Sequence, residues 1–202
     1  MPAAYQFPLQ LRFGDVDSYG HVNNVRFLQF LEDARVHWLR EPLPEGVRGG
    51  GSAAGISSDH ESRQESGSEA TMFDFVTSEN FTLVGRHEIE YLAPLLYRPA
   101  PIAVNLWMTR LGGSSFDLGY SVAERDGSAL YAYAATSMVL VSRSTGRPVR
   151  VPRGLREAFA HYSGPAVPFR RRPPLPNEGR TGSPAALPDE APAEEPATGG
   201  VA

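Results

Sequence analysis

Residues 13–24 of the chain read FGDVDSYGHVNN, and they mark a change from alternating apolar spacing to helical spacing. This loop gathers two carboxylates, a histidine and two asparagines. A loop between a strand and a helix directs backbone N–H groups and a carboxylate toward one small volume, as hydrolysis of an activated carbonyl requires. The same residues also suit a purely structural turn, in which Asn23 or Asn24 caps the helix and Gly20 supplies an unusual backbone angle.

Different periodicities flank the loop. Before it, apolar residues alternate with polar or small ones across residues 5–13, which predicts a half-buried strand, and Pro8 places that strand near a sheet edge. After it, helical spacing begins at about Asn24 and ends before Pro42. The apolar residues on the predicted buried face are Phe27, Leu31, Ala34 and Trp38, widened by Leu28 and Leu39. The charged residues on the predicted solvent face are Glu32, Asp33, Arg35 and Arg40.

Four further segments have the pattern of strands, at about residues 81–92, 101–111, 115–125 and 129–142. Gly112-Gly113 and Asp126-Gly127 are turn signals between the later segments, so we expect an antiparallel meander. A short helix is predicted over residues 153–162. The fold class is therefore α+β. One helix covers only one face of such a sheet, and the uncovered face and edges favour an oligomer.

Two segments have the composition of unfolded chain. Residues 45–70 hold six glycines and six serines with few apolar residues, which predicts a flexible insertion; a substrate lid is the alternative. Proline, alanine, glycine and glutamate dominate from residue 163 onward, which predicts a disordered tail over residues 163–202. We therefore expect one domain over residues 1–162.

The totals exclude several classes of function. The chain of 202 residues has no cysteine, which excludes a thiol nucleophile, thiolate metal sites and disulfides. The net charge is −4 with no long basic run, so neither nucleic acid nor an anionic membrane is expected as a partner. The histidines form no close ligand pair, so we expect no metal and no cofactor. The sequence has no apolar leader and no stretch that could span a bilayer, which predicts a cytoplasmic protein.

Two motifs in succession carry a family resemblance. The first is Phe13-x-Asp15-x-Asp17-x-x-Gly20-His21-Val22-Asn23-Asn24, and the second is Phe27-Leu28-x-Phe30-Leu31-Glu32-x-Ala34-Arg35. Weaker matches are Ile89-Glu90-Tyr91-Leu92-Ala93-Pro94 and Ser144-Thr145-Gly146-Arg147-Pro148-Val149. Together they resemble the hotdog-fold acyl-CoA thioesterases of the 4-hydroxybenzoyl-CoA thioesterase-like family, over about residues 5–160. The resemblance implies the hotdog fold, an antiparallel sheet wrapped around one long helix, in a homodimer or homotetramer with active sites at the interface.

The resemblance also implies roles for the loop residues. It places the catalytic carboxylate on Asp17, as general base or nucleophile; the alternative is an acceptor within its own turn. The oxyanion is expected at the helix N-terminus, with the backbone N–H of Asn24 as donor and Val22 or Asn23 beside it. Asp15 is expected to cap the turn. His21 is expected either to shape the loop or to contact the substrate, and its catalytic role is the minority alternative.

Further residues are candidates for substrate binding. In the loop these are Gly20, Val22 and Asn23, and beyond it they are Ser115, Arg143, Arg147 and Arg150. The arginines would meet the phosphates of coenzyme A; ordinary solvated arginines are the alternative. The expected reaction is hydrolysis of an acyl-CoA, or of an acyl group on an acyl carrier protein. A non-catalytic acyl-CoA-binding or scaffold protein on the same fold is the alternative, and a hotdog hydratase is a weaker third possibility.

Overall fold

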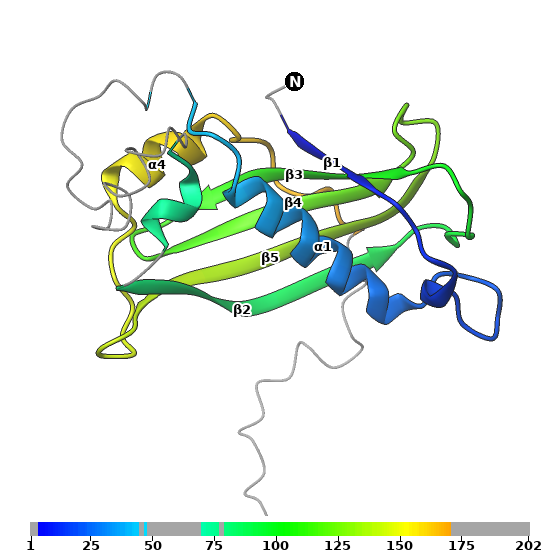
Figure 1. Cartoon of the computed structure of the whole chain (residues 1–202), viewed down its shortest axis with the longest axis horizontal. Helices are drawn as coiled ribbons and strands as arrows, with labels where there is room; N and C mark the ends of the chain where they lie inside the picture. The colour runs from blue at the N-terminus through cyan, green and yellow to red at the C-terminus, as the bar shows by residue number, and fades with distance from the viewer. Residues whose placement is uncertain (1–3, 45–46, 48–69, 77–78, 171–202) are drawn as a thin grey trace, which may run out of the picture. The chain divides into compact units, whose positions relative to one another are not determined.

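The computed structural model describes residues 4–44, 47, 70–76 and 79–170 (Figure 1). Most of the predicted flexible insertion, and the predicted disordered tail from residue 171 onward, lie outside the described residues. The sequence composition therefore remains the basis for those two predictions.

Five strands form one antiparallel sheet in the order β1-β3-β4-β5-β2. Their bounds are β1 Tyr5–Leu9, β2 Asn80–Tyr91, β3 Ile102–Leu111, β4 Ser115–Ala123 and β5 Leu130–Ser142. The helices are α1 Asn24–Leu39 and α4 Arg153–Ala160, with short 3-10 turns at η1 Phe13–Asp15 and η2 Met72–Phe75. In Figure 1, α1 lies across one face of the sheet. A sheet around one long helix is the hotdog arrangement, so the predicted fold class is confirmed.

The position of β2 in the sheet differs from the prediction, which placed β2, β3, β4 and β5 in one consecutive antiparallel meander. Only β3, β4 and β5 follow one another as neighbours; β2 pairs with β5 along its length and forms one edge of the sheet. The sequence explains the difference, because tight turn signals separate β3 from β4 and β4 from β5, whereas residues 92–101 between β2 and β3 contain prolines and no such signal. The strand β1, which carries Pro8, forms the other edge, as predicted.

The apolar face of α1 packs into the core. Trp38 is fully buried, and its ring stacks on that of Phe159 with centroids 5.1 Å apart. Phe27, Leu31 and Ala34 are buried as predicted. Burial of each large apolar side chain contributes about 1.5–3 kcal/mol.

Two positions on α1 differ from the prediction. Leu28 is 38% exposed, although it was placed on the buried face, and Arg35 is only 6% exposed, although it was placed in solvent. Both side chains line a crevice beside Val84 and His87 of β2. This flank of the helix faces the edge strand, a neighbour that helical periodicity alone does not reveal.

The ordered chain continues beyond the predicted boundary at residue 162. The backbone N–H of Met108 donates to the carbonyl of Tyr162, and that of Gly164 donates to the carbonyl of Met108, both at 2.8 Å. The indole Nε1 of Trp107 donates to the carbonyl of Pro165 at 2.7 Å. Residues 162–165 therefore pair with β3 beyond Leu106, the partner of Tyr5 at the start of β1. The prediction of a disordered tail from residue 163 is corrected, because this pairing holds residues 163–165 against the sheet. Among the described residues, no helix combines the length and apolarity needed to cross a membrane.

Candidate active site

The loop between β1 and α1 closes as a narrow hairpin at one end of the sheet (Figure 1). The N–H of Asp17 donates to the carbonyl of His21 at 2.9 Å, and the N–H of Gly20 donates to the carbonyl of Asp17 at 3.0 Å. Gly20 has a φ of +80°, which lies in the left-handed region that favours glycine. The predicted unusual backbone angle at Gly20 is thus present.

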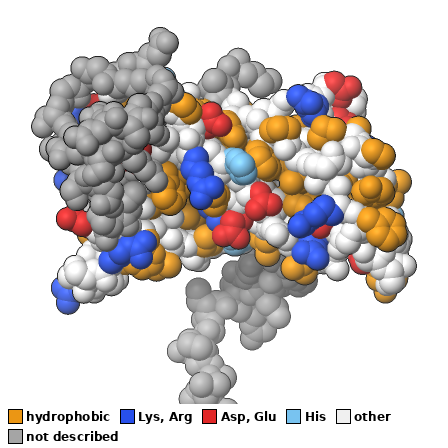
Figure 2. Space-filling model, viewed as in Figure 1, with side chains coloured by type: hydrophobic (Ala, Val, Ile, Leu, Met, Phe, Trp, Pro, Cys, Tyr) orange, Lys and Arg blue, Asp and Glu red, His pale blue; other side chains and the backbone are white. Residues whose placement is uncertain are grey.

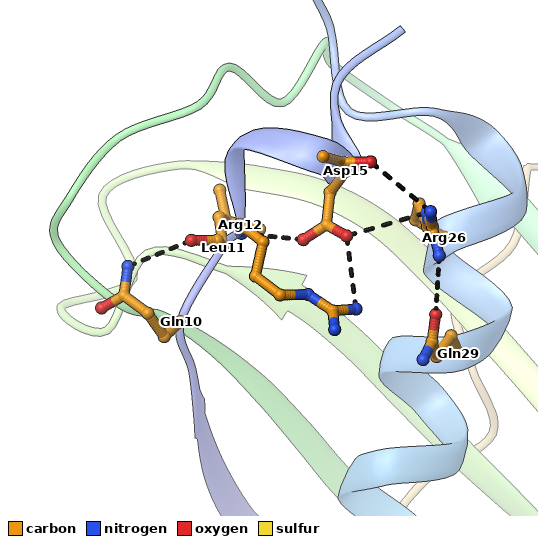
Figure 3. Close-up of polar contacts among 7 residues, drawn as sticks. Gln10, Leu11, Arg12, Asp15, Arg26 and Gln29 are labelled. Atoms are coloured by element: carbon orange, nitrogen blue, oxygen red, sulfur yellow. Dashed lines mark hydrogen bonds and ion pairs between the residues drawn. The ribbon is translucent and has the colours of Figure 1, made fainter.

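Asp15 holds the base of this hairpin (Figure 3). Its carboxylate is almost completely buried, and its Oδ2 accepts a hydrogen bond of 2.8 Å from the N–H of Arg12. Its Oδ1 lies 3.4 Å from the guanidinium of Arg12 and 3.7 Å from that of Arg26 on α1. A carboxylate paired in this way is structural, as predicted, because its oxygens bind the chain that surrounds it.

Asn23 caps α1, one of the two alternatives for the loop asparagines. Its Oδ1 accepts a hydrogen bond of 3.0 Å from the N–H of Val25. Its own N–H donates to the carbonyl of Asp15 at 2.9 Å, and the N–H of Val22 donates to the carbonyl of Leu95 at 2.8 Å. Within the described part of the chain, the N–H of Asn24 has no such acceptor. Of the three amides considered for the oxyanion, it is the one that remains available.

Asn24 lines a cavity of about 340 Å³ at the start of α1. The other lining residues are His21, Val22, Phe27 and Tyr91, with residues 92–95. The hydroxyl of Tyr91 donates to the carbonyl of Asn24 at 3.0 Å, and its ring meets that of Phe27 edge-on at 5.2 Å. Burial raises the pKa of Tyr91, so this hydroxyl keeps its proton at neutral pH. The cavity therefore combines an apolar wall with donors from the first turn of the helix.

Asp17 lies in the hairpin next to this cavity and does not line it in the single chain. It is half-buried, and its Oδ1 accepts a hydrogen bond of 2.9 Å from the N–H of Tyr19, which forms a local Asx turn. No hydrogen bond or ion pair among the described residues engages Oδ2. The structure thus brings His21, Val22 and Asn24 together at the cavity, and it places Asp17, Gly20 and Asn23 in the adjoining loop.

The remaining predicted binding residues lie at the other end of the sheet. In the pairing of β2 with β5, Tyr91 is opposite Ala132, whereas Asn80 is opposite Ser142, the residue before Arg143. The two ends of a strand of this length are roughly 35–40 Å apart. Ser115 begins β4 at the same far end, where the carbonyl of Ser114 accepts from Leu140. The predicted binding residues at this far end are Ser115, Arg143, Arg147 and Arg150. Within a single chain they lie at the opposite end of the sheet from the loop between β1 and α1.

Sequence reasoning missed the residues that wall the cavity opposite the loop. Tyr91 ends β2 and residues 92–95 follow it, and their one signal in the sequence was the weaker match at Ile89–Pro94. Hydrophobic side chains are also exposed at this end, where they gather on the surface in Figure 2. Phe13 is 80% exposed and meets the ring of Tyr97 edge-on at 5.9 Å.

A second cavity of about 530 Å³ lies along the crevice between α1 and β2. Arg35 projects into it, and its buried Nη1 has no hydrogen-bond partner within the described residues. The carboxylate of Glu32 is 3.8 Å from its Nη2. His87 Nδ1 lies 2.9 Å from Thr136 Oγ1, and burial, followed by the charge of Arg35, lowers the pKa of His87. In the described part of the chain, no three His, Asp or Glu side chains are grouped as a metal site.

The chain is similar to known proteins in sequence and in fold. The sequence model of a family described as the thioesterase-like superfamily matches residues 11–159. No curated protein sequence matches the chain.

Solved structures share the fold. The PA5185 protein of Pseudomonas aeruginosa is 28% identical, covers 79% of this chain and 91% of its own, and has a TM-score of 0.56. The PA2801 protein of the same organism, a thioesterase candidate, is 26% identical over 77% of this chain and 98% of its own, with a TM-score of 0.56. Slr0204 of Synechocystis, a 1,4-dihydroxy-2-naphthoyl-CoA thioesterase, is 19% identical over 78% of this chain and 96% of its own, with a TM-score of 0.55. At this identity, the likeness shows the fold alone.

Proposed function

This chain belongs to the thioesterase-like superfamily, and we propose that it hydrolyses acyl-CoA thioesters to a carboxylic acid and coenzyme A. A thioester carbonyl is already electrophilic. The protein must therefore activate the attacking water and stabilise the oxyanion that forms. Both tasks require polar groups that converge on one cavity beside an apolar wall for the acyl group.

The backbone N–H of Asn24 is the observation that carries this proposal. It lies at the N-terminus of α1, where the helix dipole favours negative charge, and it belongs to a residue that lines the cavity. The amides of Val22 and Asn23 are already engaged by carbonyls, so the loop leaves one donor for the oxyanion. Loss of one such donor typically raises the barrier by about 3 kcal/mol.

Asp17 supplies the carboxylate in this proposal. Its Oδ1 is held by the N–H of Tyr19, and Oδ2 takes a proton from water. The resulting hydroxide forms a C–O bond to the thioester carbon, and the oxyanion accepts from Asn24. Collapse of the tetrahedral intermediate breaks the C–S bond. The thiolate of coenzyme A leaves and takes up the proton that Asp17 received from water. Alternatively, the carboxylate itself attacks, and water then hydrolyses the mixed anhydride.

A single turnover in water labelled with oxygen-18 detects the anhydride route when water attacks the carboxyl carbon of Asp17. Attack of water on the thioester places the label in the released acid. Attack by Asp17, followed by water at the carboxyl carbon of Asp17, leaves the label in the protein. Mass spectrometry of the acid and of the peptide that contains Asp17 reads both outcomes.

We also propose that the functional unit contains two copies of the chain. The strand β2 is an edge strand of 12 residues, and Leu83 and Val84 on it are 48% and 42% exposed. An open edge of this length and character is a site for strand pairing. In an antiparallel pair of β2 edges, the end of one strand at Asn80 meets the end of the other at Tyr91. Arg143 of the second copy then lies near the cavity, which no single chain achieves.

The crevice beside α1 supports the same arrangement. A buried guanidinium nitrogen without a hydrogen-bond partner is costly, and Arg35 Nη1 is such an atom; among the described residues, the ion pair of Arg35 is the 3.8 Å contact of its Nη2 with Glu32. Two-fold symmetry gives reciprocal contacts across an interface. Glu32, which is 64% exposed, would therefore reach Arg35 of the second copy, and Arg35 would reach the second copy's Glu32.

Thiol release from a panel of acyl-CoAs, short to long and aromatic, tests the reaction. The same acyl groups on an acyl carrier protein form the second panel. We expect saturable release from at least one donor. Binding of acyl-CoA by calorimetry without release from either panel would overturn the proposal and support the non-catalytic alternative.

A further inference from the structure

Tyr131 holds both ends of the loop of residues 92–101. At the start of the loop, its carbonyl accepts hydrogen bonds from the N–H groups of Leu92 and Ala93, at 2.8 and 3.3 Å. At the far end, its hydroxyl accepts a hydrogen bond of 2.8 Å from Nη2 of Arg98. Backbone and side chain of one buried residue of β5 thus clamp a loop that spans the sheet from β2 to β3.

Glu124 completes this cluster. Its Oε1 accepts a hydrogen bond of 2.5 Å from the hydroxyl of Tyr131 and lies 2.5 Å from Nη2 of Arg98. The guanidinium of Arg98 also lies over the ring of Tyr131, 5.4 Å from its centroid. These side chains are at most 30% exposed, so solvent screens the charges only partly. We call Tyr131, Arg98 and Glu124 the loop anchor.

The loop needs side-chain anchors because its backbone has few donors. Residues 94, 99 and 101 are prolines, which lack an N–H. Among the described residues, the loop therefore relies on Tyr131 in place of a ladder of backbone hydrogen bonds. A change at the anchor is expected to move the whole loop.

The loop in turn supports the candidate active site. The carbonyl of Leu95 accepts the N–H of Val22 at 2.8 Å, two residues before the proposed oxyanion donor at Asn24. Leu95 is almost fully buried, and both Leu95 and Val22 line the cavity at the helix N-terminus. Tyr97 adds the edge-on contact with Phe13 at the start of the hairpin. The hairpin between β1 and α1 thus packs against the loop of residues 92–101, which the loop anchor holds in place.

We propose that Tyr131, Arg98 and Glu124 act as positioning residues, which fix the loop of residues 92–101 and, through Leu95, the amide of Asn24. This inference rests on the proposed function for its catalytic consequence. The geometric part concerns the hydrogen bond between Leu95 and Val22 and is measured without any substrate.

The first measurement is amide hydrogen exchange in the Tyr131→Phe variant of the full chain. This change removes one hydroxyl and keeps the ring. We expect the Val22 amide to exchange about tenfold faster, because its acceptor is no longer fixed, while the Met108 amide, bonded to Tyr162, keeps its rate. The Tyr133→Phe variant is the matched control, since no hydrogen bond of the Tyr133 hydroxyl is recorded among the described residues.

The second measurement is the turnover of the same variants. We expect Tyr131→Phe and Glu124→Gln to lower kcat about fivefold with a smaller change in KM, because the oxyanion donor is displaced while the cavity remains. Arg98→Ala should lower kcat further, and Arg98→Lys should restore part of it by keeping the cation beside Glu124.

The outcomes separate the two proposals. Unchanged exchange at Val22 in both Tyr131→Phe and Glu124→Gln would overturn the positioning role, whatever the activity. Equal changes at Val22 and Met108 would show general loosening and would also overturn it. Wild-type protein without thioesterase activity would overturn the proposed function, and the exchange result would still decide whether the anchor fixes the hairpin.

Discussion

The hydroxyl of Tyr91 donates a hydrogen bond to the main-chain carbonyl of Asn24 across 3.0 Å. The bond joins the last residue of β2 to the first residue of α1, which are separated by 67 positions in the sequence. It fixes the peptide plane that follows the proposed oxyanion donor. The first turn of the helix is therefore oriented by the sheet as well as by its own cap.

Replacing Tyr91 with phenylalanine tests this contact. The variant keeps the ring against Phe27 and loses the hydroxyl. A typical hydrogen bond contributes about 1 kcal/mol, so we expect kcat/KM to fall about fivefold. Steady-state thiol release measures the effect. A kcat/KM equal to that of the wild type would show that the Tyr91 hydroxyl does not support the reaction.

The Asp17→Asn variant is expected to fold normally and to lose turnover by about 10²–10⁴-fold, the usual contribution of a general base. Thermal unfolding checks the fold, and thiol release checks the rate. Asp126→Asn is a matched control, because Asp126 also accepts from the N–H two residues ahead, at 2.9 Å, in the turn between β4 and β5. Equal rates in the two variants would contradict the role of Asp17.

Gly20→Ala is expected to destabilise the protein by about 1–2 kcal/mol, because an L side chain at a φ of +80° is strained. Gly14→Ala is the control in the same loop. A Cβ at either glycine meets no atom within 4 Å, and only Gly20 has the positive φ. Urea unfolding of both variants measures the difference, and similar midpoints would show that the angle at Gly20 is not a constraint.

Charge reversal tests the proposed contact between copies. We expect Arg35→Glu to weaken self-association by at least about tenfold, because it faces Glu32 of the second copy with a like charge. The double variant Arg35→Glu with Glu32→Arg should recover association. Sedimentation velocity over a range of concentrations reads both, and a monomeric wild type would refute the two-copy unit.

The pKa of His87 gives a direction for pH dependence. Burial, with a further contribution from Arg35, lowers this pKa in the folded protein, so the unfolded chain binds the proton more readily. Stability is therefore expected to decline as the pH falls below the ordinary histidine pKa of about 6.5. In the His87→Gln variant, the free energy of unfolding should fall less as the pH is lowered, as measured by urea unfolding at a series of pH values. An unchanged pH dependence would show that other groups cause the decline.

Local patterns in the sequence predicted local structure correctly. The start of α1 at Asn24, the structural role of Asp15 and the backbone angle of Gly20 all depend on neighbours within a few residues. The strands β3, β4 and β5 follow one another through short turns, and their bounds were predicted to within two residues.

The features that were missed depend on partners far along the chain. Arg35 was placed in solvent because periodicity does not show that β2 lies beside that flank of the helix. Residues 163–165 were assigned to the tail because their composition does not reveal the free edge of β3. Sheet register places Arg143 and Asp17 at opposite ends of one chain, so the prediction that both belong to one site stays a prediction and requires a second copy.

The pairing of Tyr5 with Leu106 has a consequence for the order of folding. The two residues are about one hundred positions apart, so β1 docks only after a large loop has closed, which costs more entropy than the short turns of β3, β4 and β5. The hairpin of the candidate site begins a few residues after β1 and contacts the loop after β2, so it forms late. A chain still emerging from the ribosome carries the whole FGDVDSYGHVNN sequence long before it can assemble the site.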